Sequence, residues 1–191
     1  MSNQPASTKE ALLNAAVQLM AQKGVKAATT RAIARAAGVT EGAVYRHFVS
    51  KEELYLDAYT RLITTMTHAK EAIVSSSATL REKLREWVRV SYEFFDEHPD
   101  AFTFVLLTPH DLPKAQRDIT TAQSRLLIDV IKQAQVTGQM PPMRVELAAS
   151  HFIGLLLNVP RLINEGTLER PALKYVDDVC DAVYRALVVA P

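Results

Sequence analysis

Side chains that can bind an anion gather in one short stretch of the chain, between residues 29 and 51. Threonine and tyrosine hydroxyls, imidazole and long basic side chains all donate hydrogen bonds, and phosphate oxygens accept them. The first turn of a helix adds free backbone N–H groups, so threonines that begin helices suit the same ligand. The candidate donors are Thr29, Thr30, Arg31, Arg35, Thr40, Tyr45, Arg46, His47 and Lys51, and Glu41, Gly42 and Ala43 stand among them as further candidate site residues. The types of the donors predict a surface that binds phosphate.

The spacing of small and apolar residues in this stretch predicts two helices joined by a tight turn. Ala34 is small enough for one helix to cross another closely, and Gly38 stands where a helix ends in a left-handed conformation. Val44 is the apolar anchor of a second helix, Thr40 to His47, which begins at a threonine N-cap. A short helix with a polar, glycine-containing face makes a poor core element but fits the major groove of DNA. We therefore interpret this second helix as a recognition helix.

A recognition helix gives several of these residues distinct expected roles. Gly42 and Ala43 carry little side-chain bulk, so the backbone could approach the groove floor and Ala43 could contact a thymine methyl group. The three arginines of the set are long enough to reach phosphate or guanine. For Glu41, a base contact to cytosine and a solvated helix start are equally open. Thr29, Thr30 and Thr40 suit phosphates at the starts of their helices.

The same stretch resembles the tetracycline-repressor (TetR) family of bacterial transcriptional regulators. The resemblance covers roughly residues 8–56 and rests on Thr29-Thr30, Ile33-Ala34, Ala37-Gly38-Val39, Gly42, Tyr45, His47-Phe48, Ser50-Lys51-Glu52 and Leu54. It implies that Tyr45, His47 and Lys51 contact DNA phosphates. It also implies a helical body that binds a small-molecule effector and forms a homodimer.

Composition and charge agree with a modular DNA-binding protein. The chain has 191 residues, 48% of them hydrophobic, and a single cysteine, which excludes an internal disulfide framework. The N-terminus is polar and no apolar run approaches the roughly 18 residues of a membrane span, so we expect a cytoplasmic protein with no membrane partner. Residues 1–50 carry six basic and two acidic side chains, a net charge of +4, and the remainder carries −3. Phosphate attraction is needed only at the basic end.

Helical periodicity continues along the whole chain, and we expect an all-α protein of about nine helices. Residues 1–50, the head, should form a helix-turn-helix DNA-binding domain with helices at 8–23, 30–37 and 40–47. Residues 51–191, the body, should form the effector-binding and dimerisation domain. Its helices are expected at 50–74, 79–97, 100–107, 113–136, 144–165 and 171–188. Pro160 should kink or divide the fifth of these.

Aromatic side chains concentrate in the middle of the body, where plain core is their commoner role. The resemblance nevertheless implies a pocket among these helices, and an apolar lining favours a hydrophobic or aromatic effector. The candidate pocket residues are His68, Trp87, Tyr92, Phe94, Phe102, Phe104, Gln123, Leu127 and Asn158. Cys180 is expected to be a small buried hydrophobic residue.

The last two expected helices carry broad apolar faces. As the resemblance implies, two such helices from each subunit can pair with their symmetry mates in a four-helix interface. The alternative is that these faces fill the core of their own subunit. The residues concerned are Phe152, Leu155, Leu156, Val159, Ile163, Val176, Val179, Val183 and Leu187.

The sequence does not favour catalysis. It shows no paired nucleophile and base, no phosphate-binding glycine loop and no metal-ligand spacing among its five histidines. We therefore expect neither an enzyme nor a metal or cofactor. The leading hypothesis is a repressor that a small apolar or aromatic effector releases from double-stranded operator DNA. Two alternatives stay open: a DNA-associated helical scaffold regulated by a protein partner, and a helical enzyme with a DNA-binding head.

Overall fold

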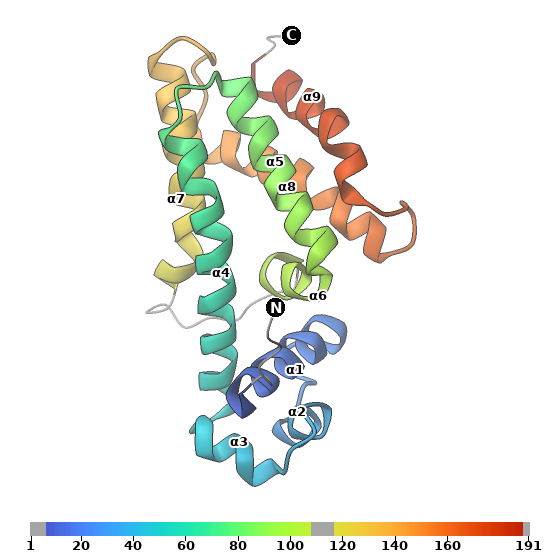
Figure 1. Cartoon of the computed structure of the whole chain (residues 1–191). Helices are drawn as coiled ribbons and strands as arrows, with labels where there is room; N and C mark the ends of the chain where they lie inside the picture. The colour runs from blue at the N-terminus through green and yellow to red at the C-terminus, as the bar shows by residue number, and fades with distance from the viewer. Residues whose placement is uncertain (1–6, 108–116, 189–191) are drawn as a thin grey trace, which may run out of the picture. The chain divides into compact units, whose positions relative to one another are not determined.

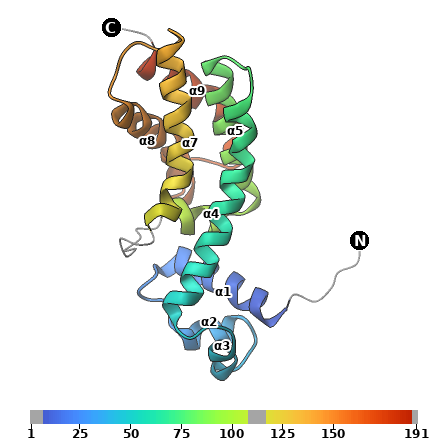
Figure 2. The ribbon, with the colours of Figure 1, turned by 90° about the vertical axis from the view of Figure 1, so that its left-hand side faces the viewer.

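The computed structural model describes residues 7–107 and 117–188, with the backbone alone for 117–123 (Figures 1 and 2). Every regular element in these ranges is a helix, which confirms the all-α prediction. No helix in the same ranges is long and apolar enough to cross a membrane. The chain forms two compact units: unit 1 is Met1–Leu62 with Asp100–Asp111, and unit 2 is Ile63–Pro99 with Leu112–Pro191.

Unit 1 contains the predicted head and extends beyond it. Its helices are α1 (Thr8–Lys23), α2 (Thr30–Ala36), α3 (Glu41–His47), the first half of α4 (Lys51–Ser75), most of α6 (Pro99–Phe102) and the π-helical η1 (Thr103–Leu107). The first four begin within one residue of their predicted starts. Segment 100–107, predicted as one α-helix, is instead a short α-helical turn followed by a π-helix, which packs against α1.

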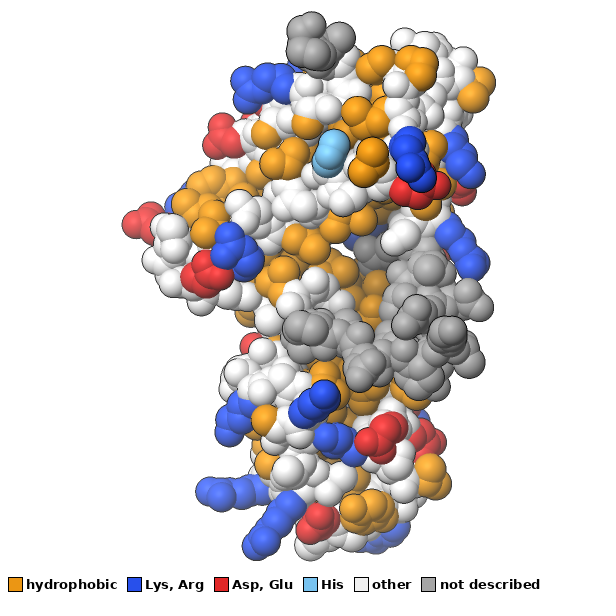
Figure 3. Space-filling view, turned by 180° about the vertical axis from the view of Figure 1, so that it is seen from behind, with side chains coloured by type: hydrophobic (Ala, Val, Ile, Leu, Met, Phe, Trp, Pro, Cys, Tyr) orange, Lys and Arg blue, Asp and Glu red, His pale blue; other side chains and the backbone are white. Residues whose placement is uncertain are grey.

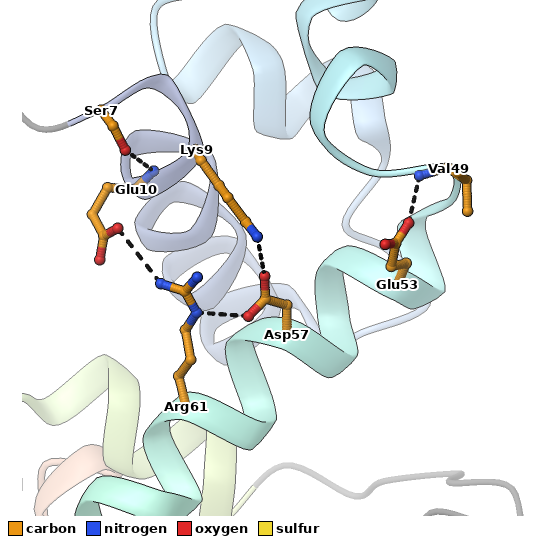
Figure 4. A network of polar contacts seen from close by, with 7 residues as sticks. All are labelled: Ser7, Lys9, Glu10, Val49, Glu53, Asp57 and Arg61. Atoms are coloured by element: carbon orange, nitrogen blue, oxygen red, sulfur yellow. Dashed lines mark hydrogen bonds and ion pairs between the residues drawn. The ribbon is translucent and has the colours of Figure 1, made fainter.

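Local capping explains why α2 and α4 begin where they do. The Thr29 hydroxyl accepts a hydrogen bond from the backbone N–H of Ala32 at 3.2 Å. At the start of α4, the Ser50 hydroxyl accepts from the backbone N–H of Glu53, whose carboxylate accepts from the N–H of Val49 at 2.6 Å (Figure 4). Each bond satisfies a backbone donor that a helix start leaves without an intrahelical partner.

A carboxylate on α4 ties this helix to α1 (Figure 4). Asp57 accepts from the Lys9 ammonium at 2.7 Å and from the Arg61 guanidinium at 2.6 Å, and Arg61 also lies 3.6 Å from Glu10. Partial burial of Asp57 raises its pKa, but the hydrogen bonds and charges of Lys9 and Arg61 outweigh this effect and hold the pKa below its ordinary value. The network joins the first helix of the head to the helix that leaves it.

Replacing this carboxylate should weaken unit 1. We expect Asp57→Asn to lower the free energy of unfolding by about 1–2 kcal/mol at pH 7, because two cations lose a shared acceptor. Since the folded-state pKa is lowered, the stabilisation is present above the unfolded-state pKa of about 4 and is lost as the pH falls through the folded value. Urea unfolding of both proteins from pH 7 to pH 2, with the exposed Asp178→Asn as control, measures this. A difference that does not change with pH would contradict it.

Unit 2 contains the second half of α4 and five further helices of the described residues, four of which are labelled in Figure 1. These are α5 (Leu80–Glu97), α7 (Arg117–Val136), α8 (Val145–Asn164), the 3-10 helix η3 (Ala172–Tyr175) and α9 (Val176–Leu187). Helix α5 packs against α9, and α8 packs against both α7 and α9. The predicted start of α7 at Pro113 lies outside the described residues. The predicted helix 171–188 is divided, because a 3-10 turn precedes α9.

Helix α8 runs through Pro160 without dividing. Proline has no backbone N–H, so the carbonyl of Leu156, four residues earlier, loses its intrahelical donor. The buried Tyr92 hydroxyl of α5 donates to that carbonyl at 2.9 Å. Burial also raises the pKa of Tyr92 and keeps the hydroxyl protonated as a donor. Of the two outcomes predicted for Pro160, a kink or a division, the structure excludes division, because a side chain from another helix replaces the missing donor.

The apolar faces of α8 and α9 are used largely within the chain. Seven of the nine residues predicted for the dimer interface are buried in a single subunit: Phe152, Leu156, Val159, Val176, Val179, Val183 and Leu187. Arg85 of α5 also pairs with Asp177 of α9 at 2.7 Å, which holds the two helices together. Leu155 and Ile163 keep partial exposure. Burial within one subunit favours the alternative that these faces fill the core of their own subunit, and the dimer interface stays a prediction.

Candidate nucleic-acid interface

Helix α3 turns one face to the core of unit 1 and the other to solvent. Gly38 adopts a left-handed φ of 70° in the turn before it, as its position after α2 predicts. Val44 is fully buried on the inner face. On the outer face Gly42, Tyr45 and Arg46 are exposed within one helical turn of each other. This face has the chemistry of a recognition surface, because Gly42 lets the backbone approach a ligand closely, Tyr45 offers a hydroxyl and Arg46 a cation.

Ala43 does not belong to the outer face. Only 7% of its surface is exposed, and its methyl group contributes to the core of unit 1 beside Val44. The predicted contact of Ala43 with a thymine methyl group is therefore corrected. The sequence showed that the residue is small, but not that its side chain points inward.

Helices α2 and α3 are joined at their outer ends by polar side chains. The Thr30 hydroxyl donates to the Glu41 carboxylate at 3.0 Å and lies 3.4 Å from the Tyr45 hydroxyl. Glu41 therefore has a role that neither of its two predicted interpretations included, since it holds the first residue of α2 against α3. No local sequence signal identifies this contact, because the two residues are eleven positions apart.

The other predicted donors are exposed on unit 1. Thr29, Arg31, Arg35, Thr40 and His47 are all exposed. Thr40 stands at the N-cap of α3, where, within the described residues, its hydroxyl makes no capping bond with the helix. The basic side chains therefore lie at the surface of unit 1, where phosphates could reach them.

Comparison with known proteins agrees with this geometry. Residues 12–58 match the family described as "Bacterial regulatory proteins, tetR family". Over 146 residues, 73% of this chain and 71% of the relative, the sequence is 28% identical to the HTH-type transcriptional repressor KstR2 of Mycolicibacterium smegmatis. Residues 12–58 are thus a DNA-binding domain of the TetR type. The chain is accordingly a DNA-binding transcriptional regulator.

Solved structures support the same fold for the whole chain. The ketosteroid transcriptional regulator KstR2 of Mycobacterium tuberculosis has a TM-score of 0.79 at 23% identity, with 99% of each chain covered. The regulator FadR of Bacillus subtilis, solved in complex with stearoyl-CoA, has a TM-score of 0.76 at 17% identity, covering 91% of this chain and 96% of its own. At these identities the likeness establishes the fold.

In the structure, Lys51 binds groups of its own chain, whereas the family resemblance implies that it contacts a DNA phosphate. Its ammonium donates to the carbonyl oxygens of Val25 at 3.1 Å and Lys26 at 3.5 Å, in the loop between α1 and α2, and the side chain is half-buried. In this arrangement Lys51 holds that loop against the start of α4.

The predicted pocket residues fall in two different units. Trp87, Tyr92 and Leu127 are buried in unit 2, whereas Phe102 and Phe104 are buried in unit 1. Within unit 1, the ring of Phe104 meets those of Tyr55 and Tyr59 edge-on, at centroid distances of 5.6 and 6.1 Å. Hydrophobic periodicity alone could not assign these aromatic residues to separate units.

The remaining candidates for the pocket are not buried in the described residues. His68 and Asn158 are exposed, and the Asn158 side chain accepts a hydrogen bond from Arg161, so neither lines the interior of this chain. Phe94 is half-buried, with its ring edge-on to His98. The side chain of Gln123 lies outside the described residues.

Gly42 provides a direct test of close approach to DNA. A Cβ atom added to Gly42 would meet nothing within 4 Å, so the fold itself does not require glycine in this helix. We expect Gly42→Ala to raise helix stability slightly, because alanine is the better helix former, yet to weaken operator binding about tenfold or more by adding bulk at the groove floor.

Thermal unfolding and fluorescence anisotropy with labelled operator DNA measure the two effects together. Ala69→Ser, a change of one exposed atom on α4, is the control. Unchanged operator affinity in Gly42→Ala would remove this position from the DNA-contacting face.

Proposed function

We propose that this protein is a transcriptional repressor that acts in the cytoplasm, binds a two-fold operator as a homodimer and leaves it when a small apolar effector binds. The observation that carries the proposal is the outer face of α3, where Gly42, Tyr45 and Arg46 are exposed on a compact helical unit. The Mycolicibacterium smegmatis relative is named as a repressor, which supports repression rather than activation. A regulator, rather than an enzyme, also agrees with the names of both structural neighbours.

The interior of unit 2 supports an apolar effector. Trp87 of α5 meets Phe152 of α8 edge-on at 6.1 Å, and Leu127 of α7 is buried in the same unit. One neighbour was solved with stearoyl-CoA and another is named for ketosteroids, so related folds serve ligands with large apolar parts. We propose the same ligand class for this chain.

Helix α4 gives the proposal its mechanism. It is continuous from Lys51 in unit 1 to Ser75 in unit 2, so a ligand that displaces its second half also acts on the first. In a dimer this would alter the spacing of the two α3 helices, which must match half-sites about one helical turn of DNA apart or a multiple of it. The free energy by which the ligand weakens operator binding can then be no larger than the difference between its binding free energies for the DNA-bound and the released conformations.

Selection from random DNA duplexes tests the proposed function. The full-length protein should enrich an inverted repeat, and fatty-acid-like or steroid-like compounds should lower its affinity for that repeat roughly 5- to 150-fold. Binding without sequence preference would contradict the repressor proposal and favour a DNA-associated scaffold. Sequence-specific binding that no apolar compound changes would contradict the effector.

We propose that the outward side of α8 forms the dimer contact. Leu147 is half exposed, and Gly154 and Asn158 follow at intervals of seven and four residues on the same side. A Cβ atom on Gly154 would meet nothing within 4 Å of this chain, so a glycine there is explained better by a close neighbour from a second copy. Hydrophobic side chains also gather on the surface of unit 2 that Figure 3 faces. We infer a symmetric crossing of two α8 helices near Gly154.

A bulky charge at Gly154 should separate the subunits. We expect Gly154→Arg to keep its helical content and become a monomer at micromolar concentration, with operator affinity reduced at least tenfold, because two recognition helices no longer act together. Sedimentation velocity measures the mass, and Ala69→Arg, an exposed change on α4, is the control. A dimeric Gly154→Arg protein would place the interface elsewhere.

A further inference from the structure

An acidic side chain stands in the part of unit 1 that we expect to face DNA. Glu41 is the single acidic residue between positions 11 and 50, a stretch with five basic side chains. It is exposed in the first turn of α3. A negative charge stabilises a helix start, but here it also repels the phosphates that the basic side chains attract. Its position therefore weakens binding to DNA in general.

The Glu41 carboxylate ends a chain of hydrogen bonds between α2 and α3. It accepts from the Thr30 hydroxyl at 3.0 Å, and the Thr30 oxygen lies 3.4 Å from the Tyr45 hydroxyl. A hydroxyl has one proton, and that of Thr30 is directed to the carboxylate, so Tyr45 must be the donor in the second contact. The chain therefore runs from Tyr45 through Thr30 to Glu41, and both hydroxyl protons point along it.

This order of donors withholds two hydroxyls from DNA. Thr30 and Tyr45 are both among the expected phosphate ligands, and a phosphate oxygen can only accept a hydrogen bond. While their protons are directed along the chain toward Glu41, the open side of each hydroxyl presents lone pairs, which a phosphate oxygen repels. The carboxylate thus opposes phosphate binding twice, through its own charge and through the donors that it holds.

The link between Thr30 and Glu41 is the stronger of the two. Its acceptor is a charged carboxylate at 3.0 Å, whereas the 3.4 Å contact with Tyr45 is long for two hydroxyls. Thr30 is half-buried and Tyr45 is 55% exposed, so water competes less for the first link than for the second. The Thr30 proton is therefore the one that Glu41 holds most firmly.

A base can compensate for the carboxylate where the sequence is right. In the major groove the N4 amino group of cytosine donates hydrogen bonds, and a glutamate carboxylate accepts them. Glu41 is in the first turn of α3, and the N-terminal residues of a recognition helix are the ones that contact base edges. Gly42, the next residue, has no side chain to hold the helix away from the groove floor.

We propose that Glu41 determines specificity, because it weakens binding to DNA in general and is compensated only where an operator half-site presents a cytosine amino group. On other sequences the carboxylate repels the backbone and keeps the Thr30 proton from a phosphate. On the operator, the hydrogen bond from cytosine offsets both costs. The inference rests on the proposed binding of a specific operator and names a residue that sets its selectivity.

Affinities of the full-length protein for two duplexes test this inference. One duplex is the operator that wild type selects from random DNA, and the other is a scrambled duplex of the same composition. We expect Glu41→Ala to bind scrambled DNA about fivefold more tightly, because a charge is removed and a hydroxyl becomes available to phosphate. Its operator affinity should not rise, so the ratio of the two affinities falls about fivefold or more. Glu52→Ala, which removes an exposed carboxylate from the first turn of α4, should change either affinity by about twofold at most.

Two further variants separate the hydroxyl from the charge. Thr30→Val keeps the branched shape but has no proton for Glu41 to hold, so adding Glu41→Ala to it should tighten scrambled binding only about twofold. Glu41→Gln keeps an acceptor for Thr30 without the charge. Because glutamine pairs with adenine, selection with Glu41→Gln should change one half-site position from cytosine to adenine. Circular dichroism and thermal unfolding confirm that each variant is folded.

The outcomes distinguish this inference from the proposed function. If wild type selects no sequence at all, both are overturned. If wild type selects an operator but Glu41→Ala behaves as Glu52→Ala does, or Glu41→Gln selects the same half-site as wild type, the inference alone is overturned. An equal gain from Glu41→Ala with and without the Thr30 hydroxyl would also overturn it, because a charge effect needs no hydroxyl.

Discussion

Helix α4 is fixed at both ends by side chains that complete its backbone hydrogen bonding. Ser50 and Glu53 cap its first turn, and Lys83 donates to the carbonyl of Val74 in its last turn. Its 25 residues, about 37 Å in length, contain neither glycine nor proline. The Asp57 carboxylate then fastens α1 to this helix through Lys9 and Arg61. Each end of α4 is therefore anchored by side chains of its own unit.

The parts of the fold that follow from local chemistry could be predicted from the sequence. Thr29 and Ser50 begin helices because their hydroxyls satisfy backbone donors nearby, and Gly38 ends a turn because it can adopt a positive φ at little cost. These signals lie within a few residues of the structure that they determine. The recognition helix was predictable for the same reason.

The parts that depend on distant residues could not be predicted. Small size made Ala43 a candidate for DNA contact, but its burial is determined by how α3 rests on α2. Lys51 looked like a phosphate ligand, yet its ammonium donates to carbonyl groups 26 and 25 residues away. The apolar faces of α8 and α9 were visible in the sequence, but whether a symmetry mate or their own subunit covers them is a question of tertiary packing.

The bond between Tyr92 and the Leu156 carbonyl has a consequence for how this chain can change over generations. Pro160 left that carbonyl without a donor, and Tyr92 supplies one from another helix. Losing the tyrosine hydroxyl first would strand a buried acceptor, whereas exchanging the proline first would restore an N–H and make the hydroxyl dispensable. The two positions are thus an ordered pair in evolution: the hydroxyl at position 92 can be lost at little cost only in lineages that have already replaced the proline, while the buried ring is still needed for packing.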